Sequence, residues 1–313
     1  MIEGSDMTTR RAVLKGIAGA SAWLATAASQ AQQTGAPGAV IKRAISRTGE
    51  QLPVIGLGTY DAFDVGRSDS DRAPLTEVLK GLVDMGGSLV DSSPMYGRAE
   101  AVVGDLTAEL RLRPSLFLAT KVWTSGRDPG IRQMEDSFRL MQTQTMDLMQ
   151  IHNLVDWKTH TATLKEWKKQ GRVRYIGITH YHEGAYDDLE RLIKTGDYDF
   201  VQLNYSIAER EAEESVLPLA QEVGVAVIAN RPFAKANLFS RVRGKEVPDW
   251  AREFDCSSWA QFFLKYIVSH PALTCAIPAT SKPKHLIDNM GAAYGRLPDE
   301  KTRQRMAEFV DRL

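Results

Sequence analysis

Short apolar runs alternate with amphipathic stretches along most of this chain. Runs rich in Val, Ile and Leu occupy residues 53–59, 88–92, 116–122, 147–153, 175–181, 200–205, 226–230 and 275–280. The stretches between them have helical periodicity. Within 73–85, for example, the apolar positions Leu75, Val78, Leu79, Leu82 and Val83 form one stripe of a helix. The pattern predicts eight strands, each followed by a helix.

The length of these units favours one architecture. Strand and helix together recur about every thirty residues, which is the size of a βα unit and indicates a parallel sheet. Eight such units predict an α/β fold of the (β/α)8 TIM-barrel type. The alternative is an open doubly wound sheet, but Gly56 and Gly58 are not followed by the third glycine of its phosphate-binding turn.

A hairpin precedes the first barrel strand. Residues 39–45 and 50–54 are separated by the turn sequence Ser-Arg-Thr-Gly at 46–49, and we expect the pair to cap the bottom of the barrel. With no further linker or low-complexity tract, residues 39–313 are predicted to form one barrel domain.

The first thirty-one residues have the features of an export signal. Arg10, Arg11 and Lys15 precede a weakly apolar, Ala- and Gly-rich region at 16–28, and small residues follow up to Ala31. The region is too weakly apolar for a stable membrane span. The paired arginines resemble a twin-arginine signal, which predicts a precursor recognised by export machinery, cleavage near residue 31 and a periplasmic mature protein. A lone amphipathic helix with a chance arginine pair is the alternative.

Composition excludes several classes of partner. Lys plus Arg and Asp plus Glu both number 39, so no net charge favours nucleic acid or an anionic membrane. The two cysteines, Cys256 and Cys275, form neither a CxxC motif nor a cluster with histidines, which argues against a zinc or redox site. Two packed thiols are favoured, and a single disulfide remains open.

Four polar residues stand at or just after the ends of three consecutive predicted strands. Asp91 ends the second strand and Tyr96 follows it, Lys121 ends the third, and His152 ends the fourth. Each alone suits a loop charge or a core group, but a (β/α)8 barrel brings these strand ends to one catalytic face. A phenol is a poor acid at neutral pH until a cation stabilises its phenolate. Lys121 can supply that charge, Asp91 can hold Lys121, and His152 can hydrogen-bond a substrate oxygen or the phenol.

Other residues near strand ends are weaker candidates. Tyr60, Trp123 and Trp157 are expected to wall a substrate pocket, with ordinary packing at the barrel top as the alternative. His180 and His182 could share a face, but no third ligand is in view, so no metal site is expected.

Six sequence blocks resemble the aldo-keto reductase superfamily in order and spacing. They are Gly56–Asp61, Val90–Gly97, Ala119–Trp123, Ile151–Asn153, Gly171–Gly177 and Ile277–Ser281. The resemblance implies a barrel that binds a nicotinamide cofactor across its C-terminal face and passes hydride to an aldehyde or ketone. Asp91, Tyr96, Lys121 and His152 match the catalytic tetrad of that superfamily.

The resemblance also implies a cofactor site, with departures. Thr179 and His180 stand where most members have Ser-Asn, Gln202 matches the second partner of the nicotinamide carboxamide, and Asn230 replaces the aromatic ring that often stacks on the nicotinamide. The remaining positions implied to contact the dinucleotide are Gly58, Thr59, Arg231, Phe233, Thr280, Ser281, Lys282, His285 and Asn289.

The identity of the dinucleotide rests on few residues. Members that prefer NADPH often carry Lys-Ser and then Arg after the last strand, whereas this chain has Ala279-Thr280 and His285. Lys282 and Lys284 nevertheless add two charges at the start of a predicted helix, where an anion is favoured. We expect NADPH to bind more tightly than NADH, with NADH possible; the alternative is that these lysines are merely solvated.

Two other functions remain open. Some members of the superfamily are redox-sensing regulatory subunits of potassium channels, although intact tetrad residues and an export signal favour an enzyme. A barrel aldolase or isomerase would use Lys121 as a Schiff-base amine, but it would leave Tyr96, His152 and Gln202 without a role.

Overall fold

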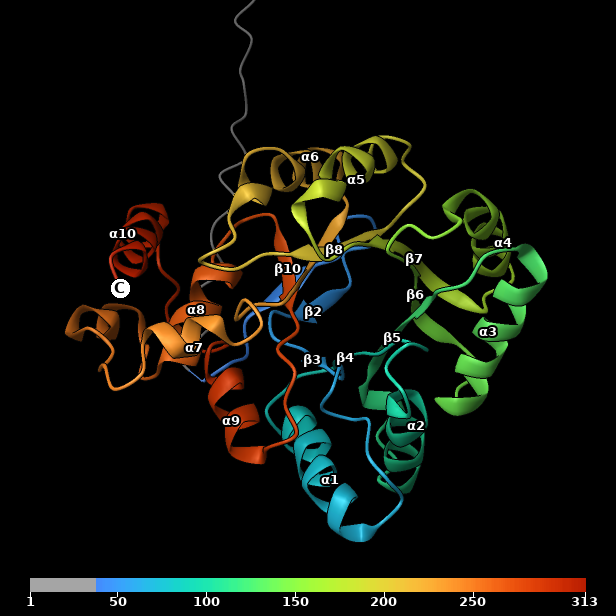
Figure 1. Cartoon of the computed structure of the whole chain (residues 1–313), viewed down its shortest axis with the longest axis horizontal. Coiled ribbons are helices and arrows are strands. Elements are labelled where there is room, and N and C mark those ends of the chain that lie inside the picture. The colour runs from blue at the N-terminus through green and yellow to red at the C-terminus, as the bar shows by residue number, and fades with distance from the viewer. Residues whose placement is uncertain (1–37) are drawn as a thin grey trace, which may run out of the picture. The chain divides into compact units, whose positions relative to one another are not determined.

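An eight-stranded parallel sheet forms the centre of the described fold, as Figure 1 shows. The computed structural model describes residues 38–313, so the expected leader lies outside the described residues. Each strand is hydrogen-bonded to the next, in the order β3 (Leu57–Gly58), β4 (Leu89–Asp91), β5 (Phe117–Val122), β6 (Met146–His152), β7 (Val173–Thr179), β8 (Phe200–Asn204), β9 (Ala226–Asn230) and β10 (Leu273–Ala276). Single parallel bridges, Ile55 to Ala276 and Gly58 to Ala279, join the last strand to the first. The predicted (β/α)8 barrel is confirmed.

Helices surround these strands, at least one after each (Figure 1). They are α1 (Asp69–Asp84), α2 (Ala99–Glu109), α3 (Arg127–Leu140), α4 (Trp157–Lys169), α5 (Tyr186–Ile193), α6 (Val216–Val223), α7 (Asn237–Arg241), α8 (Trp259–Val268) and α9 (Pro283–Gly291), with α10 (Glu300–Asp311) added at the C-terminus. α1 begins earlier than its apolar stripe because the Ser68 side chain accepts a hydrogen bond from the Asp71 amide and caps the helix. No helix within residues 38–313 is long and apolar enough to cross a membrane.

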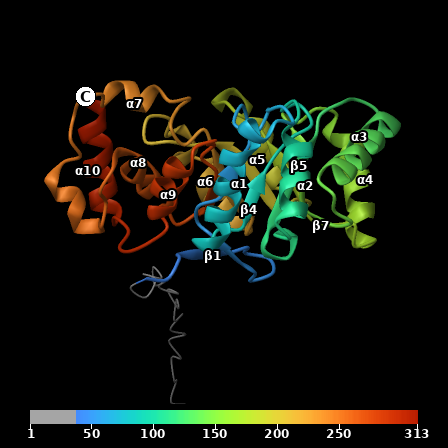
Figure 2. The ribbon, with the colours of Figure 1, turned by 90° about the horizontal axis from the view of Figure 1, so that it is seen from below.

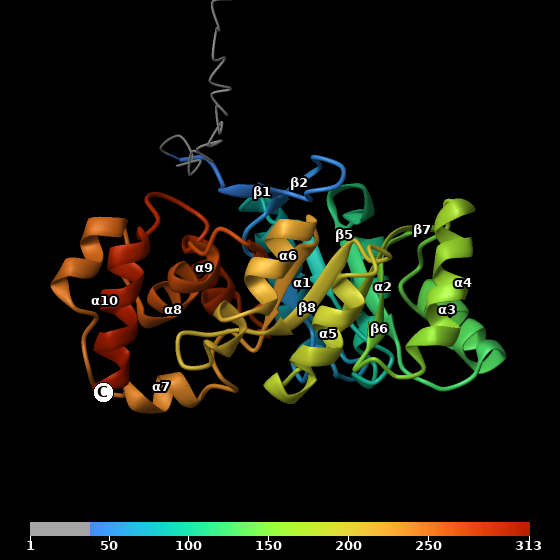
Figure 3. The same ribbon diagram turned by 90° about the horizontal axis from the view of Figure 1, so that it is seen from above.

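The predicted hairpin closes one end of the barrel. β1 (Lys42–Ala44) pairs antiparallel with β2 (Gln51–Pro53). Leu52 of β2, and Ile45 directly after β1, join the barrel-interior cluster. This cluster also contains Phe117, Tyr175 and Phe200, which lie at or near the first residues of their strands. Figures 2 and 3 show the hairpin at one end of the barrel and α7, after β9, towards the other. The C-terminal strand ends therefore stay open for a site.

The first and last strands differ from the apolar runs that predicted them. Pro53 belongs to the hairpin, and the first barrel strand is reduced to Leu57–Gly58. The last strand begins at Leu273 and ends at Ala276, before Pro278, which has no amide hydrogen to continue a ladder. Cys256 and Cys275 are both free and buried, and burial raises the pKa of the Cys256 thiol to about 11.

Candidate active site

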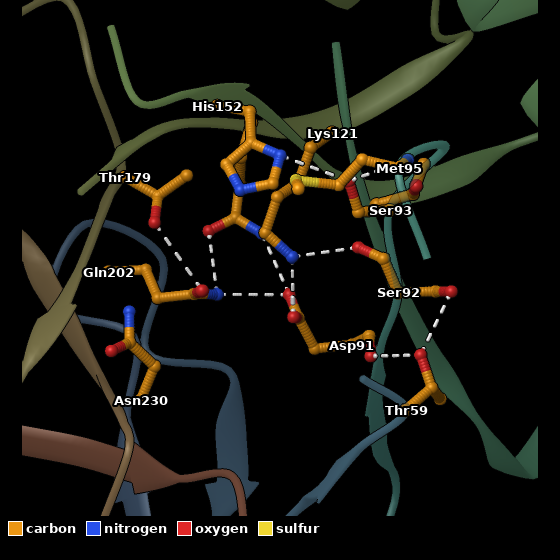
Figure 4. A network of polar contacts seen from close by, with 12 residues as sticks. Thr59, Asp91, Ser92, Ser93, Met95, Lys121, His152, Thr179, Gln202 and Asn230 are labelled. Atoms are coloured by element: carbon orange, nitrogen blue, oxygen red, sulfur yellow. Dashed lines mark hydrogen bonds and ion pairs between the residues drawn. The ribbon is translucent and has the colours of Figure 1, made fainter. Parts of the chain in front are cut away.

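A buried ion pair lies at the centre of the C-terminal face (Figure 4). Lys121, at the end of β5, donates from Nζ to Asp91 Oδ2 at 2.6 Å and to the Ser92 carbonyl at 2.7 Å. Both side chains are at most 2% exposed. Burial would lower the pKa of Lys121, but the Asp91 carboxylate beside it raises the pKa above its ordinary value. Lys121 is therefore held as a charged ammonium.

Two glutamines complete the shell around Asp91. Gln150 and Gln202 both donate from Nε2 to Asp91 Oδ1 at 2.9 Å, and Gln202 Nε2 also donates to Gln150 Oε1 at 3.1 Å. A carboxylate only accepts, so both amide nitrogens must face it. Gln150 is not among the site residues predicted from the sequence. Its position two residues before His152 in the same strand could have indicated it, because alternate strand residues share a face.

Tyr96 lies above this pair in the loop after β4. Its ring centroid is 5.0 Å from Lys121 Nζ. Burial raises the pKa of the Tyr96 phenol, and Lys121 offsets that only in part. The phenol therefore stays protonated at neutral pH, which is the form a proton donor needs before it acts.

His152, at the end of β6, lies edge-on to Tyr96 with the ring centroids 6.1 Å apart. Its Nδ1 is 3.0 Å from the Ser93 hydroxyl. Burial, and then the Lys121 and His180 charges, lower the pKa of His152 to about 3. The structure thus brings all four predicted tetrad side chains together, with His152 as a neutral imidazole.

Two of the three predicted pocket residues lie against these rings. Tyr60 packs edge-on to Tyr96 with centroids 5.1 Å apart, and Trp123 is 6.2 Å from the His152 ring. They are 54% and 42% exposed, so both present aromatic surface to solvent beside the Tyr96 and His152 rings. Trp157 instead lies against Arg191 of α5, at 5.5 Å.

The residues expected to hold the nicotinamide lie at the ends of β7, β8 and β9. Thr179 donates to Gln202 Oε1 at 3.4 Å. Because Nε2 of Gln202 is used by Asp91 and Gln150, Gln202 can offer a ligand only Oε1. His180 Nδ1 and Asn230 Oδ1 are buried without a hydrogen-bond partner in the part of the chain that the structure describes, while Asn230 Nδ2 donates to the His180 carbonyl at 3.3 Å.

The residues expected to contact the cofactor at and after the ends of β3 and β9 also make contacts within the protein. Thr59 donates to the Asp91 carbonyl and to Ser92 Oγ, both at 3.0 Å. At Gly58 a Cβ would lie 2.8 Å from the Ile277 carbonyl oxygen, so the closure of the barrel needs a glycine there. Arg231 lies 4.3 Å from the Tyr181 ring centroid, and Phe233 packs on Phe239 at 4.8 Å.

The loop after β9 adopts a costly backbone. Arg231, Ala234, Lys235 and Ala236 all have positive φ, between 46° and 69°. Such conformations in non-glycine residues cluster at ligand-binding loops, where surrounding contacts hold them.

The start of α9 forms the last part of the expected cofactor site. Thr280 Oγ1 accepts from the Lys282 amide at 3.1 Å, ahead of the first helical residue, Pro283. Lys282 and His285 are exposed, Ser281 is partly buried and Asn289 is buried. Partial burial and the neighbouring lysines lower the pKa of His285, so it is neutral at pH 7. In the described part of the chain no group of three His, Cys, Asp or Glu side chains could hold a metal ion.

Comparisons with known proteins agree with this arrangement. The model of the Aldo/keto reductase family matches residues 54–307. Methylglyoxal reductase YeaE of Escherichia coli (strain K12) is 28% identical over 246 residues, which cover 76% of this chain and 84% of the relative. An aldo/keto reductase from Klebsiella pneumoniae in complex with NADP and acetate has a TM-score of 0.70 at 24% identity, covering 87% of this chain and 95% of its own. One from the same organism in complex with NADPH has a TM-score of 0.69 at 25% identity, covering 88% and 95%.

Proposed function

Since this chain belongs to the aldo/keto reductase family, we propose that it reduces an aldehyde or ketone to the alcohol with Tyr96 as the general acid. The observation that carries the proposal is the convergence of Tyr96, His152 and the Lys121–Asp91 pair at one end of the barrel. When bound, a nicotinamide dinucleotide supplies the hydride.

The tetrad side chains divide the remaining work. Reduction of a carbonyl leaves a developing alkoxide, which needs a proton and a polarising group. Tyr96 stays protonated because burial raises its pKa, and a phenol can still protonate the more basic alkoxide. Lys121 then stabilises the phenolate that forms. Asp91, fixed by Gln150 and Gln202, holds Lys121 in place.

The polar residues at the ends of β7, β8 and β9 fit a nicotinamide carboxamide. Buried polar atoms without partners are costly, so His180 Nδ1 and Asn230 Oδ1 point to a polar ligand between the ends of β7 and β9. A primary carboxamide offers both a donor and an acceptor. His180, Asn230 and Oε1 of Gln202 would hold it.

We propose NADPH as the preferred dinucleotide. Lys282 and Lys284 at the first turn of α9 place two cations where helix amides already favour an anion such as a 2′-phosphate. The NADP and NADPH complexes of the two Klebsiella reductases support this choice. NADH, which lacks the phosphate, would be a weaker alternative.

The geometry disfavours the Schiff-base function of Lys121. A lysine attacks a carbonyl only as the neutral amine. Here Nζ donates to Asp91 and to the Ser92 carbonyl, and its pKa is raised. The regulatory-subunit alternative needs no assembled proton donor, and the intact tetrad supports catalysis instead.

One assay separates these functions. The purified protein is mixed with NADPH and a panel of aldehydes and ketones that includes methylglyoxal, and NADPH absorbance and alcohol formation are followed. We expect stoichiometric NADPH oxidation and alcohol. Tight NADPH binding without turnover of any carbonyl would favour the regulatory subunit. In a parallel sample treated with borohydride, a trapped Lys121 adduct would favour the aldolase.

A further inference from the structure

Among residues 38–313, Ser93 makes the one side-chain hydrogen bond to the His152 imidazole. Ser93 lies in the loop after β4, between Asp91 and Tyr96, and is fully buried. Its Oγ is 3.0 Å from His152 Nδ1 and accepts a long bond, 3.4 Å, from the Met95 amide (Figure 4). His152 Nε2 has no hydrogen-bond partner among residues 38–313 and is left for a ligand.

The direction of the Ser93–His152 bond follows from counting donors. The pKa of His152 is about 3, so at working pH the ring carries a single proton, on Nδ1 or on Nε2. If Nδ1 carried it, the Ser93 hydroxyl hydrogen would be buried with no acceptor within reach in the described structure. An unmade buried donor is costly. If Ser93 donates to Nδ1, its hydrogen and its oxygen are both satisfied.

We propose that Ser93 is a positioning residue that keeps the His152 proton on Nε2, so that this nitrogen donates to the substrate carbonyl oxygen. The inference rests on the proposed reductase function for its catalytic consequence. A neutral imidazole with a fixed Nε2–H polarises the carbonyl without giving up its proton. Tyr96 is then left as the acid, and the two groups do not compete for one role.

The tautomer can be observed directly in the protein. The purified protein, with histidine labelled by ¹⁵N, is examined by long-range proton–nitrogen correlation NMR with and without NADPH, and the His152 signals are assigned by their loss in His152→Gln. We expect a protonated Nε2 and an Nδ1 shifted as a hydrogen-bond acceptor. A proton on Nδ1 in the wild-type protein would overturn the proposal, whether or not any variant folds.

Ser93→Ala supplies the functional half of the test, and Ser92→Ala is its spectroscopic control. Ser92 is the adjacent, equally buried serine, but its hydroxyl meets Thr59 rather than His152. In Ser93→Ala the Nδ1 signal should leave its hydrogen-bonded position and kcat should fall about tenfold, while the NADPH Kd stays within about twofold. In Ser92→Ala the His152 signals should not move. Wild-type His152 signals and wild-type kcat in Ser93→Ala would contradict the proposal.

The two measurements also separate this inference from the proposed function. If the protein reduced no carbonyl at all, the reductase function would fail while the wild-type NMR spectrum would still report the tautomer. If it reduced carbonyls but carried the proton on Nδ1, the role of Ser93 alone would fall.

Discussion

At the scale of single residues, the site works by keeping each ionisable group in one protonation state. Lys121 is charged because the Asp91 carboxylate stabilises its ammonium, Tyr96 is protonated because it is buried, and His152 is neutral because it is buried beside Lys121. Each state is the one that its proposed role requires. The arrangement should therefore be insensitive to pH around neutrality.

The pKa of His152 has a consequence for stability. It is about 3 in the folded protein and about 6.5 in an unfolded chain, so between these values the unfolded state binds more protons. The free energy of unfolding should therefore fall as the pH falls from about 6.5 towards 3, and His152 contributes on the order of a few kcal/mol to that loss. His152→Gln should flatten the dependence, measured by urea unfolding at a series of pH values. Equal slopes in parent and variant would show that His152 titrates normally.

At the scale of secondary-structure elements, glycines allow neighbouring helices of the barrel's outer layer to approach closely. Gly104 in α2 faces the end of α3, and a Cβ there would lie 1.9 Å from the Leu140 carbonyl oxygen. Gly81 in α1 meets only the end of the flexible Leu286 side chain, at 3.1 Å. A side chain at Gly104 would therefore clash with backbone, whereas a side chain at Gly81 would meet only another side chain.

The same substitution should act in opposite directions at these glycines. Gly104→Ala forces backbone apart and should destabilise the protein by about 1–3 kcal/mol. Gly81→Ala needs only a side-chain adjustment and gains helix propensity, so it should be neutral or stabilising by up to about 1 kcal/mol. Urea unfolding of both variants is the measurement. A tolerated Gly104→Ala would mean that α2 and α3 are not in this close contact.

We propose that Lys282 and Lys284, at the start of α9, set the cofactor preference. The double variant Lys282→Ala/Lys284→Ala should weaken NADPH binding about tenfold or more and leave NADH binding nearly unchanged, because only NADPH carries the 2′-phosphate. The NADPH preference should shrink with added salt, which screens the charges. It should grow when His285 is protonated, at a pH below the ordinary pKa of histidine because the pKa of His285 is lowered.

Fluorescence titration with both cofactors measures this preference. Lys80→Ala/Lys301→Ala removes the same charge from exposed positions of α1 and α10 and is the control. Equal losses in the two double variants would mean that Lys282 and Lys284 act only through net charge.

At the scale of the whole molecule, the sequence pattern predicts the barrel because each βα unit is a local signal. The bounds of the first barrel strand are not predicted by this pattern. Leu57–Gly58 is too short to have a periodicity of its own, and β2 of the hairpin ends in the same apolar stretch. The capping hairpin is predictable from its turn residues.

The site is predictable only in part. Asp91, Lys121 and His152 stand out because they are polar residues at the ends of apolar strands, and Tyr96 because it follows such an end closely. Gln150 does not stand out, because it lies inside a strand and not at its end. Its role depends on Asp91 lying across the barrel, 59 positions away in sequence. The Ser93–His152 bond likewise needs the three-dimensional arrangement.

The expected export signal lies outside the described residues, so its test uses the whole chain. We propose that residues 1–31 direct export by the twin-arginine route, which carries folded proteins and would let the enzyme bind its dinucleotide first. Arg10→Lys/Arg11→Lys keeps the charge but should leave unprocessed precursor in the cytoplasm. Cell fractionation measures this, and normally processed protein outside the cytoplasm would reject the assignment.

The central claim is that Tyr96 donates the proton in carbonyl reduction. Tyr96→Phe removes one hydroxyl, and Tyr198→Phe is the control because it removes another buried hydroxyl, bonded to Thr161. With a good aldehyde substrate, Tyr96→Phe should lower kcat by about 10² to 10⁴, because that is the usual contribution of a general acid. NADPH affinity should stay nearly intact, and Tyr198→Phe should keep the parent rate. A Tyr96→Phe enzyme that reduces the aldehyde within about fivefold of the parent rate would contradict the account.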